Sequence, residues 1–258
     1  ALITGITTIR FASSNYMVQD LCIFLESLGV RIEGVGTHTL VVQGVDAIDM
    51  DAIGQPSEDP IEAMFLIALA ATTGSRIIIK RAPIDFLALE LLHLSKMGLR
   101  CKVSAVSIGD NGRVRLADIT VEPSRLVAPL DKIAPLPYPG LNIDNLPFFV
   151  PIAVRAEGRT LIHDWVYENR AVYYTEMNKL GADIVLADPH RVFVEGPRTF
   201  HAADIEAPPA LRPATILLIG MLAAEGESHL RNVYPINRGY ENLHERLKTL
   251  GAKIEAYD

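Results

Sequence analysis

The chain repeats one pattern four times, and this repeat constrains the fold more than any other feature of the sequence. Each copy has a glycine, a β-branched stretch, an amphipathic stretch, and then Leu-Gly or Met-Gly before another β-branched stretch. The first glycines of the four copies are Gly5, Gly74, Gly158 and Gly226. The second glycines, 23 to 25 residues further on, are Gly29, Gly98, Gly181 and Gly251. Because one such unit cannot bury its apolar face alone, we expect the copies to pack against one another.

The spacing within a copy predicts a strand, a helix and two further strands. In the first copy, apolar residues between Val18 and Leu28 recur at i, i+3, i+4, i+7 and i+10, on one face of a helix that ends at Gly29. The segments VRIEG and HTLVVQG follow it, with a turn at residues 34–36, and have the composition of strands.

The last three copies are each preceded by a segment that is apolar on nearly every side. These segments are IEAMFLIALAATT, NLPFFVPIAVRAE and PALRPATILLIGMLAAE. A helix without a polar face is enclosed by other elements rather than lying on a surface. We therefore predict an α/β fold in which the strands of successive copies form sheets around a helical centre.

Two segments depart from the repeat. Residues 46–60, DAIDMDAIGQPSEDP, have no sustained periodicity and are predicted to be a linker. Residues 105–143 contain Asn111-Gly112, which predicts a hairpin turn, and then many prolines, which preclude regular structure over much of the segment. This proline-rich stretch leads directly into Asn142-Ile143-Asp144, and the sequence leaves open whether it is a connector or a wall of a cleft.

Composition excludes several classes of protein. The chain has 258 residues, 49% of them hydrophobic, and no apolar run of the length that crosses a bilayer, so we expect no membrane association. The net charge of −7, without a Lys/Arg run, argues against a nucleic-acid partner. Cys22 and Cys101 lie in apolar contexts, which suits free thiols in a reducing compartment. No secretion signal is visible, and we expect a cytoplasmic protein.

Common catalytic motifs are missing from the sequence. It contains no phosphate-binding glycine loop, no zinc-ligand spacing and no nucleophile elbow. The seven histidines do not cluster with acidic residues at ligand spacing, so a structural or solvated role is expected for each of them. The sequence thus predicts neither a metal nor another cofactor.

Two arginines occupy the same place in the repeat. Arg170 and Arg238 each lie 12 residues after the first glycine of their copy, at the predicted start of the second helix. A guanidinium beside the free N–H groups of a helix start can bind a carboxylate or a phosphate. Alternatively, each arginine pairs with a neighbouring acid such as Glu168 or Glu241, and the spacing alone favours neither interpretation.

Two further charged residues lie at the predicted starts of the enclosed helices. Arg212 is near the start of the third, and Asp144 holds the corresponding position in the second. Charged groups at the ends of buried helices need partners or water, so together they predict a polar cleft. Asp144 is then the carboxylate available for proton transfer, unless it only caps the helix that starts at Asn145.

Several motifs resemble those of the enolpyruvyl transferase family. The resemblance covers essentially the whole chain, and the motifs that carry it are Glu157-Gly158, WVYENR, LGADI, AAEG, INRGYENL and LGAKIE. It implies an inside-out α/β barrel built from βαβαββ units, and a protein of six units in two barrels with the active site between them. This chain would then hold the last unit of one barrel (1–45), a linker (46–58) and a complete three-unit barrel (59–258).

The resemblance also implies an activity, which is transfer of the enolpyruvyl group from phosphoenolpyruvate to the 3′-hydroxyl of UDP-N-acetylglucosamine in peptidoglycan precursor synthesis. Asp144 matches the residue that contacts this hydroxyl and is a proposed proton acceptor. Val166 matches a backbone position that touches UDP-N-acetylglucosamine. Arg170, Arg212 and Arg238 match arginines that face phosphoenolpyruvate or the closed cleft.

The resemblance assigns no cofactor or metal, and it places other binding groups in two units that precede these four. Those units would carry the lysine and arginines that bind phosphoenolpyruvate and a loop with a reactive cysteine. They would therefore be required in cis or in trans, and we expect the isolated chain to be inactive.

The chain departs from the family pattern at three polar positions. An acid is replaced by Ala210 before Leu211-Arg212, a cation by Pro60 after Asp59, and an aspartate by Asn237 before Arg238. These losses leave two alternatives to the activity above. The protein would be a non-catalytic or divergent paralogue, or an enolpyruvyl transferase that acts on another hydroxyl acceptor.

Overall fold

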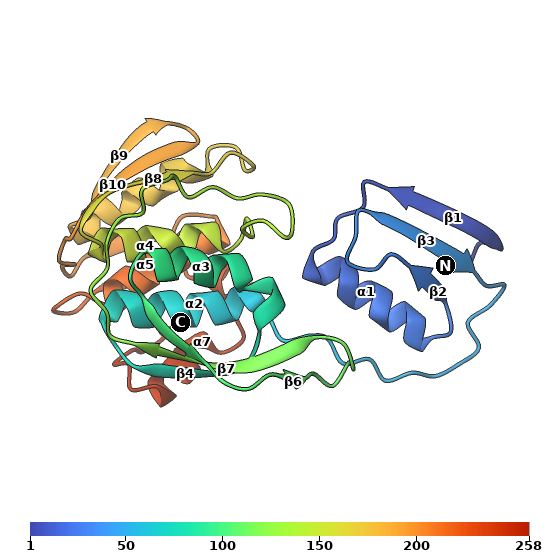
Figure 1. Ribbon diagram of the computed structural model, residues 1–258. Coiled ribbons are helices and arrows are strands. Elements are labelled where there is room, and N and C mark those ends of the chain that lie inside the picture. Colours follow the sequence, from blue (N-terminus) through green and yellow to red (C-terminus); the bar gives the residue numbers. More distant parts are fainter. Residues whose placement is uncertain (258) are drawn as a thin grey trace.

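The first copy of the repeat forms a small unit at one side of the molecule (Figure 1). The structure is a computed structural model that describes residues 1–257. Strands β1 (Gly5–Arg10), β2 (Arg31–Glu33) and β3 (Thr39–Gly44) form an antiparallel sheet in the order β1-β3-β2. Helix α1 (Tyr16–Ser27) begins where the Asn15 side chain accepts a hydrogen bond from the Val18 amide. The helix and strands predicted for this copy are confirmed.

An extended segment joins this unit to the rest of the chain. Residues 45–59 contain no helix or strand, and the backbone amide and hydroxyl of Ser57 both donate to Asp20 of α1. The small unit also touches the rest of the chain through aromatic rings. Tyr16 of α1 packs on Phe86, and Phe86 packs on Tyr138, with ring centroids 5.9 and 5.5 Å apart. The division into 1–45, 46–58 and 59–258 stays a prediction about domains.

The second and third copies each form an antiparallel sheet. In one sheet, β7 (Arg115–Glu122) pairs with β4 (Ile77–Pro83), β5 (Arg100–Val103) and β6 (Ser107–Ile108). In the other, β10 (Arg191–Gly196) lies between β8 (Gly158–His163) and β9 (Asp183–Asp188). The last strand of each copy is therefore the central one, as in the first copy. The predicted turn at Asn111-Gly112 joins β6 to β7, and this prediction is confirmed.

Shorter elements complete the copies. Helix α3 (Ala88–Lys96) follows a 3-10 turn, η1 (Ile84–Phe86), in the second copy, and the 3-10 helix η3 (Arg170–Leu180) occupies the same place in the third. In the fourth copy, β12 (His229–Arg231) pairs in parallel with β11 (Asp204–Glu206), and α6 (Tyr234–Asn237) and α7 (Leu243–Thr249) follow. Among residues 1–257, β12 is the only strand that follows the first glycine of the fourth copy.

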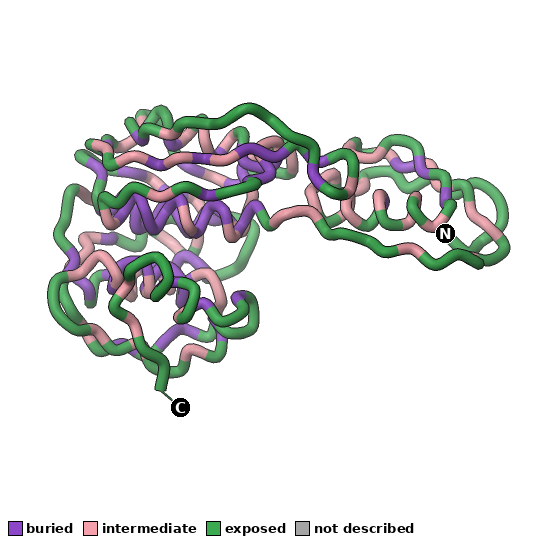
Figure 2. Tube along the Cα trace, turned by 90° about the horizontal axis from the view of Figure 1, so that it is seen from below, coloured by how far each residue is buried: buried purple, intermediate pink, exposed green. Residues whose placement is uncertain are grey.

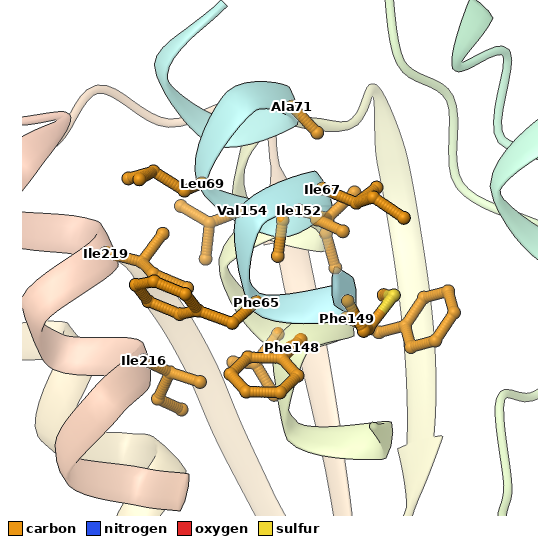
Figure 3. Packing of buried hydrophobic residues seen from close by; sticks show 14 of the residues in the cluster. Phe65, Ile67, Leu69, Ala71, Phe148, Phe149, Ile152, Val154, Ile216 and Ile219 are labelled. Atoms are coloured by element: carbon orange, nitrogen blue, oxygen red, sulfur yellow. The ribbon is translucent and has the colours of Figure 1, made fainter. Parts of the chain in front are cut away.

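The three apolar segments are helices at the centre of the larger unit. They are α2 (Pro60–Thr73), α4 (Phe149–Arg155), preceded by the 3-10 turn η2 (Leu146–Phe148), and α5 (Leu211–Leu222). Side chains such as Phe65, Ile152 and Ile216 from the three helices lie in one hydrophobic cluster and are almost fully buried (Figure 3). With helices inside and sheets outside, the architecture is an inside-out α/β barrel, as predicted.

Burial differs between the two parts of the chain. The central helices are the most continuously buried segments, whereas the small unit is mostly exposed (Figure 2). In the part of the chain that the structure describes, no helix is both long and apolar enough to span a membrane. Helix α2 ends at Gly74, whose positive φ of 65° gives the left-handed C-cap that the repeated glycine predicts.

Candidate active site

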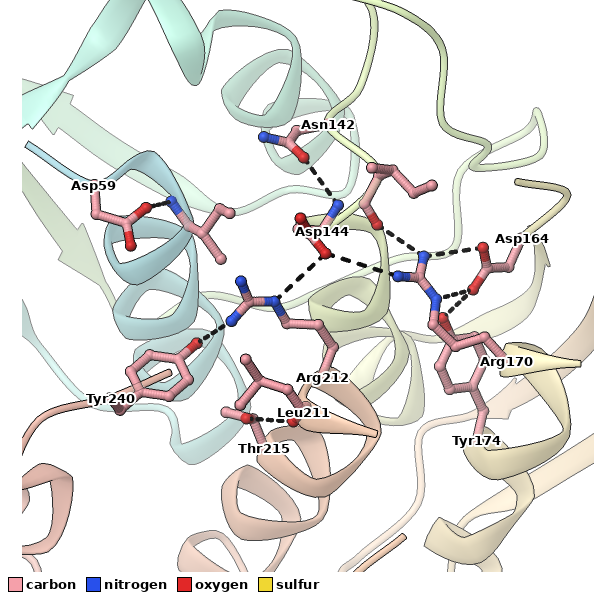
Figure 4. A network of polar contacts seen from close by, with 12 residues as sticks. Asp59, Asn142, Asp144, Asp164, Arg170, Tyr174, Leu211, Arg212, Thr215 and Tyr240 are labelled. Carbon is pink, nitrogen blue, oxygen red and sulfur yellow. Dashed lines mark hydrogen bonds and ion pairs between the residues drawn. The ribbon is translucent and has the colours of Figure 1, made fainter. Parts of the chain in front are cut away.

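Charged side chains converge at the N-terminal ends of the three enclosed helices (Figure 4). Asp59 precedes α2, Asp144 precedes η2 and α4, and Arg212 lies in the first turn of α5. Asp59 caps α2 by accepting a hydrogen bond from the Ile61 amide at 2.8 Å. Burial, aided by nearby Asp144, raises the pKa of Asp59, while its amide bond and Arg212 act in the opposite direction. Both acids and cations therefore lie together at this end of the barrel, where a polar cleft was predicted.

Asp144 lies between two guanidinium groups. Its Oδ1 atom is 3.9 Å from Nη1 of Arg170 and 3.7 Å from Nε of Arg212. The Asp144 side chain is 27% exposed, so solvent or a ligand can reach it. The carboxylate is therefore flanked by two cations at a place that a ligand can reach.

The alternative role of Asp144 as a helix cap is not realised. The backbone amide of Asp144 donates to Oδ1 of Asn142 at 2.8 Å, and the amides of Asn145 and Leu146 donate to the Asn142 carbonyl. Asn142 thus makes the turn that begins η2, and the carboxylate of Asp144 accepts no hydrogen bond within residues 1–257. That carboxylate is left to face Arg170 and Arg212.

Arg170 is fixed by a buried acid that sequence reasoning missed. Asp164 is fully buried and accepts from Nε of Arg170 at 2.5 Å and from Nη2 at 2.9 Å. The Tyr174 hydroxyl donates to the same carboxylate, and Nη2 of Arg170 also donates to the Ile143 carbonyl at 2.8 Å. The guanidinium carbon lies 4.4 Å from the ring centre of Tyr167. Arg170 therefore pairs with Asp164 rather than with a neighbouring glutamate, and Nη1 remains directed at Asp144.

Arg212 is less completely bound than Arg170. Its Nη1 donates to the Tyr240 hydroxyl at 3.1 Å, but its buried Nε has no hydrogen-bond partner within the described residues. Burial raises the pKa of Tyr240 to about 12, so its hydroxyl is neutral. Ala210, two residues before Arg212, offers no acid to fill the free donor. The unpaired Nε of Arg212 thus has Asp144, 3.7 Å away, as its nearby acid.

The structure places Arg238 differently from Arg170. Arg238 follows the short helix α6, and its backbone amide already donates to the Tyr234 carbonyl. The next helix, α7, begins only at Leu243. The prediction that Arg238 lies at a helix start is wrong, because α6 ends before Gly239 and the chain turns there. The side chain is exposed and has no ion pair or hydrogen bond within residues 1–257, and neither Asn237 nor Glu241 pairs with it.

Val166 lies on an exposed turn beside Arg170. Trp165, Val166 and Tyr167 follow β8 and are 46%, 45% and 48% exposed. The Trp165 indole donates to the carbonyl of Pro135 at 2.9 Å, which fixes the turn against the proline-rich segment. That segment is therefore a connector that also borders the candidate site.

Sequence reasoning missed Asp164 and Tyr174 because their roles depend on tertiary contacts. The one sequence signal for Asp164 is its position directly after β8, a strand in which buried and partly exposed residues alternate. Among the described residues, no group of three His, Cys, Asp or Glu side chains is arranged to hold a metal ion. Cys22 and Cys101 are free, and burial raises the pKa of Cys101 to about 11, which makes it unreactive.

Comparison with known proteins identifies relatives of the whole chain. The profile of the EPSP synthase (3-phosphoshikimate 1-carboxyvinyltransferase) family matches residues 1–247. UDP-N-acetylglucosamine 1-carboxyvinyltransferase of Bradyrhizobium diazoefficiens is 33% identical over 253 residues, which cover 97% of this chain and 57% of that protein. The enzyme of the same name from Treponema denticola is 33% identical over 99% of this chain and 58% of its own length.

Solved structures have the same fold. The enolpyruvyl transferase NikO from Streptomyces tendae superposes with a TM-score of 0.81 and 29% identity, over 99% of this chain and 57% of that one. EPSP synthase from Acinetobacter baumannii superposes with a TM-score of 0.78 over 99% of this chain and 58% of that one, and its 20% identity shows the fold alone. The chain spans a little over half the length of the proteins it matches.

Proposed function

The chain belongs to the EPSP synthase family of enolpyruvyl transferases, and on this basis we propose that the protein transfers the enolpyruvyl group of phosphoenolpyruvate to the 3′-hydroxyl of UDP-N-acetylglucosamine. This step supplies a peptidoglycan precursor in the cytoplasm. The names of the relatives support the acceptor, because the similar proteins from Bradyrhizobium diazoefficiens and Treponema denticola are both UDP-N-acetylglucosamine 1-carboxyvinyltransferases.

The observation that carries the proposal is the position of Asp144 between Arg170 and Arg212. The transfer needs a base for the acceptor hydroxyl and cations for an anionic donor, and it needs both within one cleft. Asp144 is the base in this proposal. The guanidinium of Arg212 binds a phosphate or carboxylate oxygen of phosphoenolpyruvate in this proposal. Arg238, which is exposed, binds the donor when the cleft is closed.

The chemistry is an addition followed by an elimination. The acceptor oxygen bonds to the central carbon of the enolpyruvyl group as Asp144 takes the hydroxyl proton, and the terminal methylene gains a proton. Loss of phosphate and of one methyl proton then restores the double bond and gives the enolpyruvyl ether. The cations stabilise the charge on phosphate as its bond to carbon breaks.

The proposal includes groups that lie outside this chain's four repeats. The relatives are longer, and we assign the remaining donor-binding groups to further repeats, supplied in cis or in trans. The Arg170, Arg212 and Asp144 cluster opens to solvent through Asp144, which leaves a face for such groups.

The test measures phosphate release by the full-length protein with phosphoenolpyruvate and UDP-N-acetylglucosamine. We expect Asp144→Asn to lower kcat by about 10²- to 10⁴-fold, the range of a lost general base, with a small change in stability. Glu227→Gln, which changes an acid that is 86% exposed, is the matched control and should retain wild-type turnover. If Asp144→Asn loses turnover and stability to the same extent, the role of Asp144 is structural and the proposed base is contradicted.

A different hydroxyl acceptor is the second candidate function, and the unpaired Nε of Arg212 beside Ala210 favours it. Because Ala210 replaces an acid, a different acceptor would have to supply the polar group that pairs with Arg212. Phosphate release with 3-phosphoshikimate in place of UDP-N-acetylglucosamine distinguishes the two. No phosphate release with either acceptor would favour a non-catalytic paralogue.

A further inference from the structure

Glu90 is a buried acid without a cation. It lies on α3 and is 2% exposed, and no ion pair to it is present within residues 1–257. Its Oε1 atom accepts from the backbone amide of Asn142 at 3.1 Å and from Nδ2 of Asn145 at 2.8 Å. Burial raises the pKa of Glu90, and these hydrogen bonds oppose the increase. A buried carboxyl group costs free energy unless hydrogen bonds satisfy it, so its partners define its role.

Both partners of Glu90 flank Asp144 in the chain. The backbone amide of Asn142 donates to Glu90, and the side-chain oxygen of Asn142 accepts a hydrogen bond from the backbone amide of Asp144 at 2.8 Å. Asn145 follows Asp144 directly and is fully buried. On the far side, Arg170 donates to the Ile143 carbonyl. The backbone that carries Asp144 is therefore held from α3 on one side and from Arg170 on the other.

The repeat gives independent support. Glu90 lies 16 residues after Gly74, and Tyr174 lies 16 residues after Gly158. Tyr174 donates to Asp164, which holds Arg170, and Glu90 accepts from the two residues that hold Asp144. The same position in two repeats thus carries a polar group that hydrogen-bonds to residues beside Asp144 or Arg170.

We propose that Glu90 is a positioning residue that holds the 142–145 turn, and with it the carboxylate of Asp144, between Arg170 and Arg212. This inference rests on the proposed function, because it supposes that Asp144 acts on the acceptor. Without Glu90, the Asn142 amide and the Asn145 side chain lose their common acceptor. The turn then shifts, and a displacement of about 1 Å at a reacting group can cost about 10²-fold in rate.

Activity of the full-length protein with phosphoenolpyruvate and UDP-N-acetylglucosamine is the first measurement. Glu90→Ala should lower kcat by about 10- to 100-fold and change the KM for phosphoenolpyruvate by less than about twofold. Glu90→Gln retains the Oε1 acceptor and should restore kcat to within about threefold of wild type. Leu94→Ala, one turn further along α3 and fully buried, is the control for lost packing. Equal kcat losses in Glu90→Ala and Leu94→Ala would overturn the proposal.

Hydrogen–deuterium exchange separates this inference from the proposed function. Glu90→Ala should accelerate amide exchange in a peptide covering residues 139–147 at least about tenfold, whether or not the protein has transferase activity, because the Asn142 amide loses its acceptor. Leu94→Ala should not accelerate exchange there selectively. If Glu90→Ala does not fold, Asn145→Ala replaces it and should give a smaller acceleration. Unchanged exchange in the folded variant would overturn the proposal even for an active enzyme.

Discussion

The third and fourth repeats carry the same arginine in two different environments. Arg170 is 6% exposed and makes two hydrogen bonds to buried Asp164, whereas Arg238 is exposed and has no side-chain partner in the described part of the chain. Both residues lie 12 positions after the first glycine of their repeat. An equivalent position in the repeat therefore fixes neither the local secondary structure nor what the side chain contacts.

The difference has a cause in the neighbouring repeat positions. Asp164 lies six residues after its glycine, and the fourth repeat has Asn232 there. Tyr174 lies 16 residues after its glycine, and the fourth repeat has Asn242 there, with a positive φ of 46°. Without an acid to bind it, Arg238 stays exposed. The third repeat thus holds a buried, paired cation, and the fourth holds an exposed one.

The largest expected effect comes from removing the fixed cation. Arg170→Ala leaves the carboxylate of Asp164 buried without a cation, which should lower the free energy of unfolding by about 3–5 kcal/mol. Arg238→Ala, the matched change in the fourth repeat, should lower it by no more than about 0.5 kcal/mol. Urea unfolding of both variants checks the comparison, and similar losses would mean that the two environments are energetically alike.

Tyr174→Phe should have a smaller effect in the same direction. The change keeps the ring but removes a hydrogen bond to a charged, buried group, a loss of about 1.5–3 kcal/mol. Tyr240→Phe is the matched change beside Arg212. Because Arg212 still lies close to Asp144 in this variant, Tyr240→Phe should lose less stability. A larger loss in Tyr240→Phe, measured by thermal unfolding, would contradict the greater dependence of the third repeat on its buried network.

The second repeat extends the comparison with a buried acid that has no cation. Burial raises the pKa of Glu90 above its usual value of 4.5, so the folded state binds a proton more tightly than the unfolded state. The stability of the wild type should therefore fall as the pH rises from 4.5 through the folded pKa of Glu90. Glu90→Gln should remove this part of the pH dependence, which unfolding curves at several pH values can measure. A pH dependence identical to that of wild type would show that Glu90 does not titrate there.

The smallest expected effect tests whether an acid alone can recruit Arg238. Asn232→Asp supplies the fourth repeat with the residue that the third has at this position. Because Arg238 is exposed, a new ion pair should raise the free energy of unfolding by only about 0.2–1 kcal/mol. The measurement is a double-mutant cycle with Arg238→Ala, and a coupling energy of zero would mean that the backbone of the fourth repeat keeps the two groups apart.

The sequence predicted the architecture because every repeat had to bury its own apolar face. The three enclosed helices and the first-copy helix all form where their spacing indicated. The polar contacts depended on residues brought together from different elements. The sequence pattern singled out neither Asp164, which follows β8, nor Glu90, which lies on α3. Only the tertiary structure shows that both are buried and that Asn142, rather than Asp144, makes the turn.

Trp165 gives the candidate site an intrinsic optical reporter. It is the only tryptophan of the chain, it follows Asp164 directly, and its ring is half-exposed while its indole N–H donates to Pro135. An indole in such a position changes its emission maximum and its quenching by iodide when water near it is displaced. Occupancy of the cleft beside Arg170 can therefore be followed by fluorescence titration without a label and without turnover.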